Sequence, residues 1–102
     1  MFPSHDRMAS NYNQVQQTRT TISSADTWTA VNIPIGSRFP LLACEDTSVT
    51  FRVSVDNTIG TDQGTFIPAK GAYTFEGVNT AVFTIYVSLS SSATMILIFT
   101  KD

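Results

Sequence analysis

Ionisable and reactive side chains are scarce in this sequence of 102 residues. It has one histidine, one cysteine, six basic and eight acidic residues, so only 14% of it is charged, against about 25% in an ordinary globular domain. The basic residues are too few and too scattered for the cluster that a phosphate backbone requires, so we expect no nucleic-acid partner. The single cysteine, Cys44, excludes a disulfide within the chain and is typical of a small core residue.

Long apolar runs are also missing. The longest, residues 95–99 (MILIF), is far shorter than the roughly 20 residues of a membrane helix. Residues 1–20 contain no continuous apolar segment of the kind found in a signal peptide. We therefore expect neither direct export nor a membrane partner, and synthesis in the cytoplasm.

The sequence contains few side chains that could act in catalysis. Its one histidine, His5, lies in a polar stretch beside Asp6, whereas a catalytic triad needs groups that the fold brings together around a nucleophile. Nearly all the acidic residues lie in turns or near the chain ends, where Asp bends and caps the backbone. We predict that the protein is not an enzyme and has no catalytic or cofactor-binding residues.

Metal ligands are few as well. Zinc and iron sites need clusters of His or Cys, and none is present. Residues 56–62 (DNTIGTD) gather three oxygen-bearing Asp and Asn side chains, but without the alternating ligand spacing and closing Glu of a calcium loop. A turn between strands predicts the same composition, so we predict no metal, with calcium in this loop as the weaker reading.

Residues 1–22 differ from the rest of the chain. Residues 10–18 are polar, weakly charged and without helical or strand periodicity. We predict an extended or disordered N-terminal arm at 1–22, followed by one domain at 23–102.

The pattern of residues 23–102 predicts strands separated by turns that contain Gly, Pro, Asn, Asp and Ser. The clearest alternation is at 48–56, where Val49, Phe51, Val53 and Val55 are expected on one face. Further strands are expected at 27–33, 39–44, 66–67, around Tyr73 and Phe75, 81–89 and 93–101. With no helix pattern, this predicts an all-β fold: an antiparallel β-sandwich, jelly-roll-like, with six to eight strands.

The last strand is apolar on both faces. Such a strand is either central to a two-layer core or pressed against another subunit. Met95, Leu97 and Phe99 are therefore candidates for core or subunit packing. The aromatic residues Trp28, Tyr73, Phe75 and Tyr86 offer faces on which sugars stack, although core packing is the preferred interpretation.

Two segments support a resemblance: residues 33–38 (IPIGSR) and 66–75 (FIPAKGAYTF), the second followed by two closing strands. By this pattern, residues 25–102 resemble the small accessory virion proteins of tailed bacteriophages, which carry one β-sandwich and decorate or cement the capsid. The resemblance rests on strand pattern and involves no catalytic motif.

The resemblance implies a homo-oligomer, with a trimer expected, on the outside of the capsid and bound to the major capsid protein. It also implies that an N-terminal arm reaches neighbouring subunits; Arg19, Thr20, Thr21 and Ile22 are the expected contacts, because residues 18–22 favour a strand that can add to a sheet edge. The alternatives are another virion component (tail, fibre base or head–tail accessory) and a carbohydrate-binding β-sandwich module.

Overall fold

The structure, a computed structural model, describes residues 15–75 and 83–101. Those residues form eight strands and no helix, and hence no helix that could cross a membrane. The strands are β1 (Val15–Ile22), β2 (Thr29–Ile33), β3 (Ser37–Cys44), β4 (Phe51–Ser54), β5 (Thr65–Ile67), β6 (Ala72–Thr74), β7 (Phe83–Leu89) and β8 (Ala93–Lys101). The prediction of an all-β chain with six to eight strands is confirmed.

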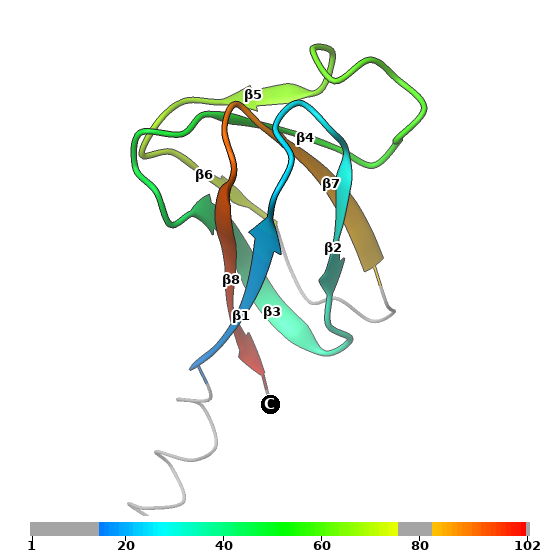
Figure 1. The fold of residues 1–102 in the computed structure, drawn as a ribbon. Helices are drawn as coiled ribbons and strands as arrows, with labels where there is room; N and C mark the ends of the chain where they lie inside the picture. Colours follow the sequence, from blue (N-terminus) through cyan, green and yellow to red (C-terminus); the bar gives the residue numbers. More distant parts are fainter. Residues whose placement is uncertain (1–14, 76–82, 102) are drawn as a thin grey trace, which may run out of the picture.

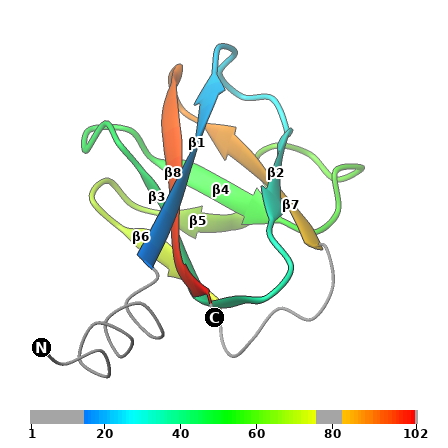
Figure 2. The ribbon, with the colours of Figure 1, turned by 90° about the horizontal axis from the view of Figure 1, so that it is seen from below.

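The strands make two four-stranded sheets. Sheet A has the order β1-β8-β3-β6 and sheet B the order β2-β7-β4-β5, and the neighbouring strands pair antiparallel. In Figure 1 strands β1 and β8 run alongside each other, and in Figure 2 β8 lies between β1 and β3, with β4 and β5 behind it. The apolar faces of both sheets contribute to a single buried cluster, so the two sheets pack face to face.

The alternation predicted for residues 48–56 is confirmed up to Ser54: the residues expected on the buried face are buried. Val49, Phe51 and Val53 are at most 3% exposed, whereas Arg52 and Ser54 lie on the other face of β4. Val55 was expected with the buried set but is 68% exposed. The reason is that β4 ends at Ser54, so the period of two no longer applies to the next residue.

Strand β8 lies in the interior of sheet A and uses both of its faces. Met95, Leu97 and Phe99 are at most 3% exposed and belong to the core between the sheets. The alternate residues Ile96 and Ile98 lie on the opposite face, where Ile98 is 38% exposed. The doubly apolar pattern therefore has one half in the core and one half on the outside of the sheet.

Residues 15–22 lie within sheet A, so the predicted boundary after Ile22 does not separate an arm from the sheets. Strand β1 pairs with β8 over its whole length, from Val15 opposite Thr100 to Ile22 opposite Ala93. Ile22 is 2% exposed in the core. Backbone pairing with β8 and this one buried side chain hold a strand whose other residues are mostly polar. The rest of the predicted arm, residues 1–14, lies outside the described residues.

Strand β3 contains an irregularity at Phe39. The register with β8 shifts between Arg38 and Leu41, and Phe39 has φ 47° in the left-handed region. Pro40 has no N–H to donate, but its carbonyl accepts a hydrogen bond from the N–H of Phe75 at 2.9 Å. The bulge leaves Phe39 66% exposed while β3 remains connected to the β6 side of the sheet.

Candidate functional site

The outer face of sheet A is apolar at its centre. In the register of the sheet, Leu41 of β3 lies opposite Ile98 of β8, and Ala43 lies opposite Ile96. These four residues, which alternate with buried core residues on the same strands, are partly or fully exposed. Contiguous apolar surface of this kind can form a contact with another protein when it is large enough.

Strand β1 flanks this face with polar groups. Arg19 lies opposite Ile96 and Thr21 opposite Thr94, so both share the outer face with them. The guanidinium of Arg19 forms an ion pair with the carboxylate of Glu45, and both side chains are about half exposed. An exposed pair of this kind contributes about 0–1 kcal/mol, so its main effect here is to leave the edge strand without a net charge.

The four predicted arm contacts are therefore divided between two faces. Arg19 and Thr21 face outward, where a partner can reach them. Thr20 lies opposite Met95 on the inner side and is half-buried, and the side chain of Ile22 is enclosed in the core. Met95, Leu97 and Phe99, which were candidates for core or subunit packing, all lie in the core of the chain itself.

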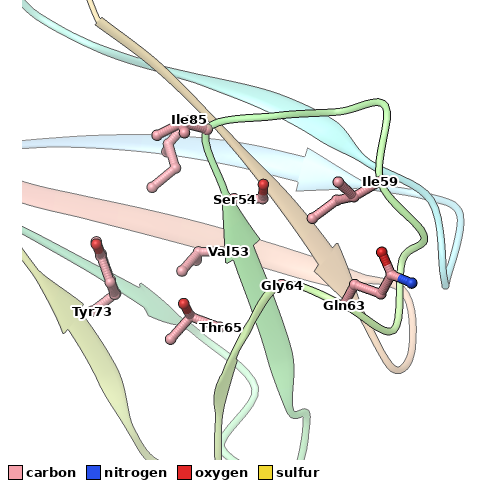
Figure 3. Close-up of a pocket in the computed structure, with 9 residues that line it drawn as sticks. Val53, Ser54, Ile59, Gln63, Gly64, Thr65, Tyr73 and Ile85 are labelled. Carbon is pink, nitrogen blue, oxygen red and sulfur yellow. The ribbon is translucent and has the colours of Figure 1, made fainter.

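A second feature is a pocket of about 290 Å³ beside the loop that joins β4 and β5. Its floor includes Val53 and Ile85, which are 3% and 2% exposed. In the view of Figure 3, Tyr73 lies on one side of the pocket and the loop residues Ile59 and Gln63 on the other. The described residues that line it are Val53, Ser54, Val55, Ile59, Gln63, Gly64, Thr65, Tyr73 and Ile85.

The loop beside this pocket is anchored near its middle and at its C-terminal end. The indole N–H of Trp28 donates a hydrogen bond to the carbonyl of Ile59 at 2.9 Å, and Arg52 donates to the carbonyl of Gly64 at 3.0 Å. The Arg52 guanidinium also lies 5.0 Å from the centre of the Phe66 ring, a cation–π contact. These contacts fix the loop against sheet B.

Asp56 organises the first turn of the same loop. Its carboxylate accepts hydrogen bonds from the hydroxyl of Thr58 at 2.6 Å and from its backbone N–H at 2.8 Å. These two hydrogen bonds lower the pKa of Asp56. The Asp56 carboxylate therefore stabilises the turn that the composition of residues 56–62 predicts. Within residues 15–75 and 83–101, no three or more His, Cys, Asp or Glu side chains gather where they could hold a metal ion.

The aromatic residues have separate roles. Trp28 clamps the loop through its N–H and Tyr73 lines the pocket. The rings of Tyr73 and Phe75 meet edge to face, with their centroids 4.9 Å apart. Both side chains pack against the core, which agrees with the preferred interpretation of these aromatic residues. Tyr86 lies opposite Ala30 and Ser54 on the outer face of sheet B.

Cys44 is the cysteine that the sequence singles out, and it does not line the pocket. Cys44 is free, half-buried and opposite Met95 in sheet A. Burial raises the pKa of its thiol, which disfavours the reactive thiolate. His5 and Asp6 lie outside the described residues.

Sequence reasoning missed most of the pocket. Gln63, Gly64 and Thr65 lie between the turn at 56–62 and the strand expected at 66–67 and were assigned no role, and Ser54 was only one residue of the strand expected at 48–56. Their shared position depends on β4, β6 and β7 meeting beside the loop, and no local pattern signals it.

Comparisons with protein-family models, with curated proteins and with solved structures found no match for this chain.

Proposed function

We propose that the chain is a non-enzymatic structural protein of a bacteriophage virion, a decoration or cement protein that binds the major capsid protein as a homo-oligomer, with a trimer expected. The observation that carries this proposal is the apolar outer face of sheet A. It gives a small, weakly charged domain a surface for adhesion on the side of the sheet opposite the core.

The strand order supports the jelly-roll part of the proposal. Strands that are distant in sequence are neighbours within each sheet, in the orders β1-β8-β3-β6 and β2-β7-β4-β5. Eight antiparallel strands wound in this way into two four-stranded sheets correspond to a jelly roll, an architecture that recurs in viral capsid and lectin domains. The likeness concerns fold, and function must be argued from surfaces.

The outer face of sheet A supports contact between copies. An adjacent subunit can cover the apolar side chains of Leu41, Ile96 and Ile98. Association of copies would then bury apolar area that a single small domain leaves exposed. Arg19 and Thr21 on the neighbouring edge strand provide polar groups toward the major capsid protein.

Attachment as an oligomer allows weak individual contacts to hold the protein on a capsid. Linked subunits rebind before the whole assembly leaves a lattice, so that avidity exceeds the affinity of one contact. A net charge of −2 on each chain limits the repulsion between copies placed close together on a capsid.

The direct test is attachment to particles. Capsids prepared without the protein are mixed with the purified chain, sedimented and heated while genome release is followed. We expect the wild type to co-sediment with the capsids and to raise the temperature of release. Ile98→Asp should lose both effects, because it places a charge in the centre of the outer face.

The control is Val55→Asp, which introduces the same charge at an exposed valine on the β4–β5 loop, outside sheet A; Val55 is 68% exposed and Ile98 38%. It should behave as the wild type. Immunolabelling of complete virions then separates the virion alternatives, because label on tails instead of heads supports a tail or head–tail component. Absence of the protein from particles, or unchanged attachment by Ile98→Asp, overturns the proposal.

A further inference from the structure

Among the residues that the structure describes, no charged side chain lines the pocket beside the β4–β5 loop. The polar side chains in this lining are the two hydroxyl groups of Ser54 and Thr65, the phenol of Tyr73 and the amide of Gln63. A charged ligand placed there would lose hydration without gaining a counter-charge, which is costly. The lining therefore favours an uncharged ligand.

Several of these polar groups are available to a ligand. In the part of the chain that the structure describes, the hydroxyls of Thr65 and Tyr73 make no hydrogen bond with the protein. The amide oxygen of Gln63 accepts a long hydrogen bond from the N–H of Gly60 at 3.4 Å, which leaves its amide nitrogen as a donor. The pocket thus presents both hydroxyls and an amide donor.

The rest of the lining is apolar. Val53 and Ile85 form a buried floor, and Ile59 stands on the loop at the side of the pocket (Figure 3). The volume of about 290 Å³ is at the small end of the range for ligand sites, roughly 300–1,000 Å³. A single ring with C–H groups on its faces and hydroxyls around its rim matches this combination of size and surface.

The site is also formed in advance. Trp28 and Arg52 hold the loop by its backbone carbonyls, and Gly64 packs so closely against Val53 and Trp28 that no side chain fits at its position. A site held in this way loses little conformational entropy when a ligand enters.

We propose that this pocket binds one uncharged pyranose unit of a glycan, with Thr65, Tyr73 and Gln63 bonding its hydroxyls and Val53, Ile59 and Ile85 contacting its C–H faces. This inference does not depend on the proposed function, because the pocket lies away from the outer face of sheet A. It also assigns sugar contact to Tyr73 and leaves Trp28 to hold the loop.

The test is a titration followed by backbone amide NMR. Glucose, galactose, mannose and N-acetylglucosamine are added separately to the uniformly ¹⁵N-labelled full chain, with N-acetylneuraminic acid as the charged comparison and glycerol as a non-cyclic polyol. We expect at least one neutral sugar to give saturable shifts at the amides of Ile59, Gly64 and Thr65. The charged sugar should bind at least tenfold more weakly, and glycerol should not saturate.

Two variants that delete only a hydroxyl locate the site. Tyr73→Phe and Thr65→Val should each weaken sugar binding about tenfold, the effect of one lost hydrogen bond. Tyr86→Phe and Thr21→Val make the same chemical changes outside the pocket and should bind as the wild type. Because these hydroxyls make no hydrogen bond within the described residues, all four variants should keep the wild-type spectral dispersion.

The proposal is overturned if no neutral sugar gives saturable shifts. It is equally overturned if the shifts map to the outer face of sheet A, if glycerol or the charged sugar binds as well as the neutral sugars, or if the two pocket variants bind as tightly as their controls.

Discussion

Gly64 occupies a position where the backbone leaves no room for a side chain. A Cβ at this residue would lie 2.6 Å from the carbonyl oxygen of Val53 and 2.7 Å from the Trp28 ring. Both neighbours are fixed, one in β4 and the other by its hydrogen bond to Ile59. The glycine therefore allows the loop to pack closely against sheet B.

We predict that Gly64→Ala lowers the free energy of unfolding by about 1–3 kcal/mol, the usual cost of overpacking. Urea denaturation followed by tryptophan fluorescence measures it, since Trp28 is the one tryptophan and contacts the substituted position. Gly60→Ala is the matched control: its new Cβ would meet only the flexible Asp62 side chain closely. Equal stability of the two variants would contradict this packing.

Two exposed carboxylates make stability depend on acid. The backbone N–H and hydroxyl of Ser48 lower the pKa of Asp46, and the hydroxyl and N–H of Thr58 lower that of Asp56, both from an ordinary value of 3.8. A carboxyl group with a lower pKa in the folded state stabilises the fold above its unfolded pKa. That stabilisation is lost as the pH falls through the folded pKa.

We therefore expect the unfolding free energy to be insensitive to these two groups near neutral pH and to fall below about pH 3.8. Asp56→Asn should reduce the acid-dependent part of the loss, because its amide cannot be protonated in this range. Urea titrations at a series of pH values measure the difference, with Asp62→Asn in the same loop as control. A wild type and an Asp56→Asn variant with the same acid dependence would contradict the role of the Thr58 hydrogen bonds.

Among the elements, β1 was predicted only in part: residues 18–22 favour a strand, but the sequence did not show that residues 15–22 belong to the sheets. Strands at 27–33, 39–44, 48–56 and 93–101 were predictable because apolar residues alternate along them or fill them. Strand β1 has Gln and Thr at most positions, and its inward-facing residues Gln16 and Thr18 remain exposed. Pairing with β8, which lies at the other end of the sequence, holds it in place, and that contact leaves no local signature.

Of the two candidate surfaces, one was likewise predictable from a local apolar pattern and the other was not. The exposed face of β8 was visible in the sequence because residues 95–99 are apolar at every position. The pocket was not, because Val53, Gln63, Tyr73 and Ile85 come from four separate segments that only the sheet order brings together.

Truncation tests the place of β1. Deleting residues 1–22 should abolish cooperative folding, because it uncovers the length of β8 and removes Ile22 from the core. Loss of one buried isoleucine costs about 2–5 kcal/mol, a large share of the 5–15 kcal/mol of a typical domain. Deleting residues 1–14 leaves every described contact in place and should preserve folding. Circular dichroism and thermal unfolding compare the two, and a stably folded chain without residues 1–22 would contradict the account.

On the scale of the whole molecule, the outer face of sheet A should determine the association state. We expect the native mass to be a multiple of 11.1 kDa, with three copies expected, and Ile98→Asp to shift it to a single chain. Native mass spectrometry and analytical ultracentrifugation measure this directly, with Val55→Asp as the variant that should keep the wild-type mass. A wild type that remains a single chain at high concentration would remove the support for contact between copies.

The pairing of Val15 with Thr100 brings both ends of the described chain to one end of sheet A (Figure 1). A short linker can therefore join them, and the exposed turn at Ser91 and Ser92, between β7 and β8, can be opened instead. Such a circularly permuted protein would keep both sheets while making β8 and β1 neighbours in sequence. Its longest-range pairing would become a local hairpin, so it should fold faster than the natural order of strands.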